Sequence, residues 1–391
     1  HHHYGIDGMA ALLNECPPDE NTPFFKSRNH TPNSIAARFV SATFWVRQMR
    51  RMASRELETI IRNQLGFVHR GRQLYVSDEQ LRRREEQRHR NTEMMKYKII
   101  INELGEDFRL DEVVAKTNAN PAVRRAELMV RIAGFEHMAK ELEHVGEFIT
   151  LTCPSRFHVR SAAKGYKNNK FDGSTPSDAQ DYLNKVWARI GTHLSREKIK
   201  IYGFRVTEPH HDGCPHWHGL FFMPKESRRR FRQIVAQHGC RADRLELKLF
   251  YHQTRQEAVA VARALWVSHC KMAEETNAKK PTLASVIAKQ KCEAEVWREA
   301  DYKLFGQVSA RVTFKAIDWN KGSAAGYIAK YIAKNIDGKN TNDKSVGWDY
   351  EAAESTGVDV TAKRVDAWAA TWRIRQFQQI GGAPVTIWRE L

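Results

Sequence analysis

The stretch Glu208-Pro-His-His-Asp-Gly-Cys-Pro-His-Trp-His-Gly-Leu-Phe-Phe-Met223 decides the fold. Its second half is strand-forming, and His216 and His218 are two residues apart, so their imidazoles point to the same face of a strand. The pair Asp212-Gly213 predicts a turn that folds the chain back on itself. Such a hairpin brings Glu208, at the end of the preceding strand, beside the two histidines.

One carboxylate and two imidazoles that face one point suit a divalent ion with open coordination positions. His210, His211 and Asp212 compete for the place of the third ligand; in the alternative interpretation they form the turn or orient the ligands. Cys214 could bind zinc, but a single cysteine without a partner is more typical of a turn. The candidate metal ligands are Glu208, His216 and His218.

Strand-like and helix-like segments surround this hairpin. A β-rich segment ends at Pro154, and a loop rich in Gly, Asn, Lys and Ser occupies 164–177. In chain order the expected elements are strand 147–153, helix 178–200, strand 201–208, strand 216–223, basic helix 226–238, strand 310–317 and helix 323–336. This order predicts an α+β fold with helices packed on an antiparallel sheet.

The last of these helices repeats a Tyr-Ile-Ala-Lys unit, in Gly326-Tyr-Ile-Ala-Lys-Tyr-Ile-Ala-Lys-Asn335. Tyr327 and Tyr331 are i and i+4, so they stack on one helix face about 6 Å apart. Each has a lysine three residues later, Lys330 or Lys334. A phenol, with a pKa of about 10, is a poor nucleophile unless activated, and an ammonium favours the phenolate or a negative phosphate. The alternative is an amphipathic helix with two tyrosines at the core edge.

The sheet-forming region is expected to be one domain at 146–338, with a helical insertion at 241–305 that is helical over most of 254–301. Residues 1–33 form an irregular lead-in, whose first three histidines resemble the remainder of a purification tag. Residues 339–391 form a C-terminal segment with a helix near 362–380. The chain stops abruptly after a β-like stretch, as expected of a fragment of a longer protein.

The region at 34–145 is expected to be mainly helical. Ser34 predicts the cap of a helix with apolar positions between Ile35 and Met49. Ser77 with Gln80 resembles a capping box, and Asn120 followed by Pro121 is a good helix start. The region carries no functional motif, and a role in DNA binding or origin recognition is suggested only by its charge.

The composition favours a polyanionic partner. The chain has 391 residues, enough for two or three domains, and 63 basic against 46 acidic side chains give a net charge of +17. Nucleic acid is the first candidate, because phosphate neutralisation drives sequence-independent affinity; the alternative is a basic protein without such a partner. No run of about 18 apolar residues predicts a membrane span, and no secretory signal opens the chain. The six scattered cysteines indicate free thiols in a reducing cytoplasm.

Three features occur in the order found in the HUH endonuclease superfamily: the strand at 148–152, the His216-Trp-His218 motif and the pair of tyrosines. The segment Ala324-Ala-Gly-Tyr-Ile-Ala-Lys-Tyr-Ile-Ala-Lys-Asn335 resembles the tyrosine motif of the bacteriophage replication gene A proteins, which initiate rolling-circle replication. The resemblance covers about 147–337 well and is expected to extend to residue 391.

This resemblance implies an HUH-type antiparallel sheet that nicks and rejoins single-stranded DNA at a replication origin, in the cytoplasm of a bacterial host. It implies a divalent metal, for which we expect Mg²⁺ or Mn²⁺, a covalent 5′-phosphotyrosine, and a free 3′-OH that primes the host DNA polymerase. The residues it implies are the ligands Glu208, His216 and His218 and the catalytic groups Tyr327, Tyr331, Lys330 and Lys334.

Other classes remain open. Relaxases and single-strand transposases share the metal motif, although many transposases carry a single tyrosine. A zinc hydrolase would need no tyrosine, and a DNA-binding protein without chemistry would need no metal motif. No G-x-x-x-x-G-K-[ST] loop is present, so unwinding would fall to a separate helicase of the host. Candidate contacts to the DNA backbone are Arg228, Arg229, Arg230 and Lys321.

Overall fold

The computed structural model describes residues 32–161, 166–243, 247, 255–286, 306–320, 322–339 and 358–382. The chain divides into two compact units, residues 1–60 and 61–391. In the first unit, the described residues form helices α2 (Pro32–Phe39) and α3 (Ala42–Thr59). The expected single helix is therefore wrong: Ser34 lies inside α2, and Ser41 caps α3 by accepting a hydrogen bond of 3.2 Å from the Phe44 amide.

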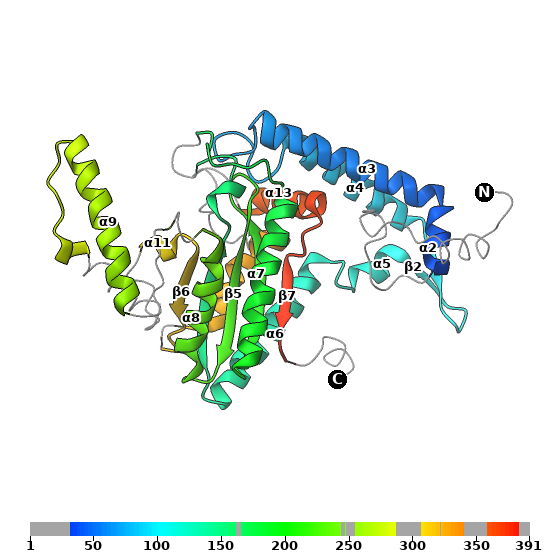
Figure 1. The fold of residues 1–391 in the computed structure, drawn as a ribbon. Helices are drawn as coiled ribbons and strands as arrows, with labels where there is room; N and C mark the ends of the chain where they lie inside the picture. Colours follow the sequence, from blue (N-terminus) through cyan, green and yellow to red (C-terminus); the bar gives the residue numbers. More distant parts are fainter. Residues whose placement is uncertain are drawn as a thin grey trace. The chain divides into compact units, whose positions relative to one another are not determined.

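The second unit contains an antiparallel sheet of five strands in the order β6-β3-β5-β4-β7. Figure 1 shows the sheet with helix α7 running along it. The strands are β3 (Val145–Thr152), β4 (Tyr202–Pro209), β5 (Pro215–Met223), β6 (Val312–Ala316) and β7 (Phe377–Ile380). The predicted α+β class is confirmed, and the strand and helix order around the hairpin agrees with the one expected.

Helices cover both faces of this sheet, which makes β5 buried along its whole length. Trp217 and Phe221 point to the face covered by α7 (Pro176–Arg196) and α8 (Ser227–Gly239). Leu220 and Phe222 alternate with them and point to the face covered by α6 (Pro121–Glu141) and α12 (Ala324–Ile336). Because side chains alternate along a strand, His216 and His218 share the second face.

Local capping explains where the long helices start. Asn120 accepts a hydrogen bond of 3.0 Å from the Ala122 amide, with Pro121 in the first turn, as predicted. Thr175 and Asp178 form a capping box at the start of α7. Although α6 precedes residue 146, its apolar side chains Leu128, Ile132 and Phe135 belong to the core of the sheet.

The rest of the predicted N-terminal helical region is not uniformly helical. Ser77 caps α4 by accepting a hydrogen bond of 3.2 Å from the Gln80 amide, as expected. A short hairpin was not expected; it forms because three consecutive isoleucines are followed by a turn in which Gly105 has φ +79°. The elements are η1 (Ile60–Gln64), α4 (Asp78–Lys96), β1 (Ile99–Ile101), β2 (Asp107–Arg109) and α5 (Leu110–Ala115).

The predicted helix near 362–380 is corrected to a helix followed by a strand. Helix α13 (Val358–Trp372) ends at Arg373, whose φ of +54° is left-handed, and the Ile374 amide turns back to donate to the Ala369 carbonyl at 3.0 Å. Strand β7 then pairs with β4, because the open edge of β4 offers backbone groups that need partners. The C-terminal segment thus completes the sheet.

Short elements and the insertion complete the described chain. Within 241–305 the structure describes a long helix, and residues 287–305 lie outside the described part. The remaining elements are η2 (Ser155–Phe157), η3 (Arg241–Asp243), α9 (Arg255–Glu275) and α11 (Gly306–Ser309). Lys321 and the β-like end of the chain also fall outside the described residues. None of the described helices has the length and apolar character needed to cross a bilayer.

Candidate functional site

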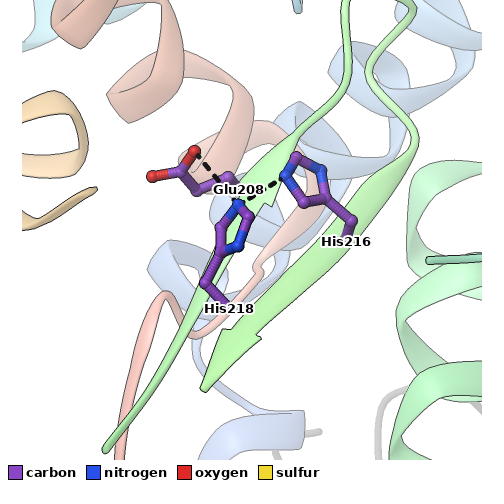
Figure 2. Close-up of side chains that lie close together, drawn as sticks. All are labelled: Glu208, His216 and His218. Carbon is purple, nitrogen blue, oxygen red and sulfur yellow. Dashed lines mark hydrogen bonds and ion pairs between the residues drawn. The ribbon is translucent and has the colours of Figure 1, made fainter. Parts of the chain in front are cut away.

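The hairpin of β4 and β5 brings three predicted ligands together. Glu208 pairs with His216 across the strands, and His218 follows two residues later on the same face. The Nε2 atoms of the two histidines are 2.8 Å apart, and Glu208 Oε2 lies 3.9 Å from His218 Nε2. Figure 2 shows the three side chains pointing toward one another from neighbouring strands. Among the described residues, this is the one group of three or more such side chains close enough to share an ion.

The surroundings of the two histidines suit ligation of a cation. Burial holds the pKa of His216 well below its usual range, with further lowering by His210 and His218, so His216 is neutral and keeps a lone pair. Its Nδ1 is buried without a hydrogen-bond partner among the described residues. His218 Nδ1 lies 3.0 Å from Thr150 Oγ1. If His218 Nδ1 carries the proton and donates it to Thr150 Oγ1, the lone pair of Nε2 is free to bind a cation.

Two imidazole nitrogens and one carboxylate oxygen therefore fit a single divalent cation with bonds of about 2 Å. The contacts of Glu208 keep its carboxylate turned to this point. Asn335 Nδ2 donates to Oε1 at 2.6 Å, and Lys334 Nζ lies 3.4 Å from Oε2. Asn335 is itself positioned by Gln376, whose Nε2 donates to its Oδ1 at 3.0 Å. A buried carboxylate is stable only when such partners surround it.

The competing ligand candidates belong to the turn. Asp212 is fully buried and accepts hydrogen bonds from the Val159 amide at 2.9 Å and the Cys214 amide at 3.1 Å. Burial alone would raise the pKa of Asp212, but the charge and hydrogen bond of His158 bring it well below its usual range. The His210 ring lies against the His216 ring, with centroids 4.0 Å apart. Asp212 and His210 thus support the hairpin.

Residues distant in sequence clamp this turn. Arg62 Nε donates to the Asp212 carbonyl at 2.6 Å, and Trp368 Nε1 donates to the Gly213 carbonyl at 2.8 Å. Gly213 has φ +78°, and a Cβ there would lie 2.8 Å from the Tyr75 carbonyl oxygen, so glycine is required. The predicted Asp-Gly turn is confirmed, and its rigidity comes from both ends of the second unit.

Helix α12 places one tyrosine directly against the histidines. Ile328 and Ile332 are buried and anchor the helix on the sheet. The Tyr331 ring lies over the His218 ring, with centroids 4.0 Å apart, and stacks on Phe148 at 5.5 Å. Burial and the negative charge of Glu208 raise the pKa of Tyr331 above its usual range, so its hydroxyl is protonated at neutral pH.

The lysines lie differently from the pairing that the repeat suggested. Lys330 Nζ lies 4.8 Å from the centroid of the Tyr331 ring, whereas Lys334 forms the ion pair with Glu208 described above. The half-buried Tyr327 instead has Lys315 of β6 over its ring, with Nζ 4.5 Å from the centroid. An ammonium beside a ring face is attracted to it but does not by itself ionise the phenol.

Sequence reasoning missed several residues of the site. Thr150, Lys315 and Gln376 approach through strand pairing or long-range contacts, and no local pattern marks them. Asn335 is the last residue of the tyrosine motif, but nothing in the sequence shows that its amide contacts Glu208. The predicted DNA-contacting arginines belong to α8, which packs on the opposite sheet face, and Arg230 is paired with Glu197 at 2.5 Å.

Comparison with known proteins gives a consistent family. The model of the bacteriophage replication gene A protein family matches residues 14–339. The chain is 39% identical to the replication gene A protein of Escherichia phage 186 over 90% of this chain and 42% of that protein. It is 31% identical to the replication gene A protein of Escherichia phage P2, over 92% of this chain and 40% of that protein.

A probable replication endonuclease from a prophage-like region of Salmonella typhimurium is 30% identical over 92% of this chain and 36% of that protein. The chain thus spans about two fifths of the length of these relatives. No solved structure matches it. Because the family match covers most of the sequence, the chain belongs to the bacteriophage replication gene A protein family.

Proposed function

We propose that this chain carries the nicking and joining centre of a rolling-circle replication initiator of the HUH type. The observation that carries the proposal is the position of Tyr331 beside the group of two histidines and a carboxylate. Its ring centroid lies 4.0 Å from that of His218. A zinc hydrolase would have no use for a tyrosine at this place. The names of the relatives, which include a probable replication endonuclease, support the same reading.

Glu208, His216 and His218 would hold Mg²⁺ or Mn²⁺, and the bound cation would polarise a phosphate oxygen and offset its developing charge. Glu208 is oriented for this by Asn335 and Lys334. Thr150 would set the tautomer of His218. The chain's own residues thus provide a buried, preorganised donor set of two imidazoles and one carboxylate.

In the proposed nicking step, a tyrosine oxygen attacks the phosphorus of a single-stranded DNA phosphate. A bond forms between that oxygen and phosphorus, and the bond from phosphorus to the 3′ oxygen breaks. The phenol loses one proton and the departing oxygen gains one, so a 3′-OH and a 5′-phosphotyrosine result. Joining is the reverse, with a 3′-OH attacking the phosphotyrosine. Lys330, exposed beside the Tyr331 ring, can stabilise the phosphate in transit.

The two tyrosines support alternating roles in successive rounds. Tyr327 is one helical turn from Tyr331, about 6 Å along the axis, and Lys315 supplies it with its own cation. One tyrosine would remain linked to the 5′ end while the other cuts the regenerated origin. The new 3′-OH would then close the circle by attacking the first phosphotyrosine.

The test is covalent capture of DNA. The chain is incubated with a random-sequence single-stranded library and Mg²⁺ or Mn²⁺, and a denaturing gel is examined for a protein–DNA adduct whose DNA is then sequenced. A label at the 3′ end of the DNA should stay with the protein, and a label at the 5′ end should be released. Absence of any adduct from the library and from phage DNA, or retention of the 5′ label, would contradict the proposal.

A milder prediction concerns the threonine behind His218. Thr150→Val keeps the shape of the side chain but removes the oxygen that lies 3.0 Å from His218 Nδ1. We expect Mn²⁺ affinity, measured by isothermal titration calorimetry, to fall about 10–100-fold. Thr313→Val is the matched control, because Thr313 pairs with Thr150 on the neighbouring strand and is exposed. Equal Mn²⁺ affinity in both variants would show that Thr150 does not orient the ligand.

A further inference from the structure

A cavity lies on the sheet face opposite the histidines. Its volume is about 240 Å³, and it is bounded by the first turns of α7, by β4 and by the link from α13 to β7. Arg205 of β4 lines it, together with Arg373 and Arg375. Asp181 is the one acidic residue in its lining, against three arginines.

Arg205 is the unusual member of this lining. It is only 4% exposed, and its guanidinium carbon lies 3.4 Å from the centroid of the Trp217 ring. Its Nε is buried and has no hydrogen-bond partner, and no carboxylate in the described part of the chain forms an ion pair with it. Burial, together with the like charge of Arg375, lowers the pKa of Arg205 to about 9, so it remains charged at neutral pH.

An arginine buried in this way needs an anion. Taking a guanidinium out of water costs free energy that is normally offset by a paired carboxylate or by hydrogen bonds. Elsewhere in the same unit, the buried Arg311 pairs with Asp243, and Arg232 pairs with Glu147 at 2.9 Å. Gln180 and Gln378 add polar groups to the cavity wall. A small anion with several acceptor oxygens matches this lining.

We propose that this cavity binds a backbone phosphate of the DNA strand that the site cleaves, with Arg205 and Arg375 as its donors. The proposal rests on the proposed function, which supplies the single-stranded DNA. Arg205 is three residues before Glu208 in β4, which corresponds to about 10 Å along the strand on the opposite face. The cavity is therefore close enough to serve the same strand a few nucleotides from the nick.

Two hollows border the same segment at the edge of the sheet. A second hollow, of about 420 Å³, lies on the histidine-facing side, where Phe204 and Arg131 line it. Both hollows share Ile374, Arg375 and Gln378. In the proposed arrangement, the DNA strand would cross this shared edge segment to reach the Arg205 cavity.

Two substitutions at Arg205 test the proposal. Arg205→Met removes the charge at similar volume, and Arg205→Lys keeps the charge without the planar fork. Lys185→Met, on the exposed side of α7 outside the cavity, controls for the loss of one positive charge. Arg311→Met controls for the loss of a buried arginine that has a carboxylate partner. The readouts are the thermal midpoint with and without inorganic phosphate, and the affinity for a single-stranded oligonucleotide across salt concentrations.

We expect Arg205→Met to keep or raise the thermal midpoint of the free protein, because an uncompensated buried charge is removed. The rise in midpoint that inorganic phosphate gives the parent protein should disappear. Oligonucleotide affinity should fall about tenfold, and the slope of log affinity against log salt should become shallower by about 0.7, as for one lost phosphate contact. Arg205→Lys should keep part of the phosphate effect, Lys185→Met all of it, and Arg311→Met should lower the midpoint.

Three results would overturn the proposal. A lower midpoint for Arg205→Met with an unchanged phosphate effect would make Arg205 structural, or paired with a carboxylate outside the described residues. A phosphate effect that vanishes while the oligonucleotide salt slope stays the same would mean that the cavity takes free phosphate and not DNA. If inorganic phosphate does not raise the midpoint of the parent protein, and Arg205→Met does not change the salt slope, the cavity binds no phosphate. If Arg205→Met loses the phosphate effect and has the shallower salt slope, but the parent protein forms no adduct, the result would count against the nicking centre and not against the phosphate site.

Discussion

A chain with both Tyr327→Phe and Tyr331→Phe is expected to form no covalent adduct with single-stranded DNA, a loss of about 10⁴-fold or more in the rate of capture. The change removes the two nucleophilic oxygens and keeps the rings, so the stacking of Tyr331 on His218 and Phe148 is preserved. DNA affinity should stay close to that of the parent chain, because many basic contacts supply it. The measurement is the adduct band on a denaturing gel, alongside a binding assay.

Each single tyrosine variant should still form some adduct, and both should lose successive rounds of cleavage on a circular template. We expect Tyr331→Phe to slow the first cut more, since its ring lies against His218. Tyr182→Phe is the matched control: Tyr182 is half-buried, lies on α7 beneath the other sheet face, and should change neither readout. If one single variant forms no adduct and the other behaves as the parent through repeated rounds, the alternating scheme is wrong.

The second large effect concerns the histidines. His216→Ala or His218→Ala should reduce cleavage about 10³-fold or more, because each removes an imidazole from the buried group of three candidate ligands. DNA affinity should be largely retained. Mn²⁺ binding, followed by calorimetry, should be lost in the same variants, which separates loss of the ion from loss of DNA.

His210→Ala provides the comparison for these variants. The His210 ring packs on His216 but lies outside the group of three, so we expect a smaller loss of Mn²⁺ affinity, no more than about 10–100-fold. Full nicking by the His216→Ala, His218→Ala double variant in the presence of a chelator would rule out a metal centre at this place. A loss in His210→Ala as large as that in His216→Ala would make His210 a ligand.

The hairpin and its three candidate ligands could be predicted because the rules involved are local. A spacing of two residues in a strand puts His216 and His218 on one face, and an Asp-Gly turn of known geometry returns the chain past Glu208. The tyrosine spacing was equally readable, because residues four apart lie on one side of a helix. Helix starts at Ser77 and Asn120 followed from short-range hydrogen bonds.

Other features could not be predicted, because they depend on partners far away in the sequence. The segment at 377–380 has no strong strand pattern, and it is a strand only because the edge of β4 lies beside it. Likewise, no spacing rule predicts that Asn335 contacts Glu208 and is itself positioned by Gln376. Nor does one predict that α6 covers the histidine-bearing face of the sheet.

The sequence by itself determined which chemical groups meet at the hairpin, since backbone periodicity and one turn bring Glu208, His216 and His218 to the same face of two paired strands. Tertiary structure decided the electrostatic state of those groups. Lys334, expected beside a tyrosine, is drawn to the buried carboxylate of Glu208, and Tyr331 is more difficult to ionise because it is buried near that same charge. Such outcomes depend on desolvation and on distances between elements that only packing sets, which is also why Arg205 stands buried without a carboxylate in the described chain.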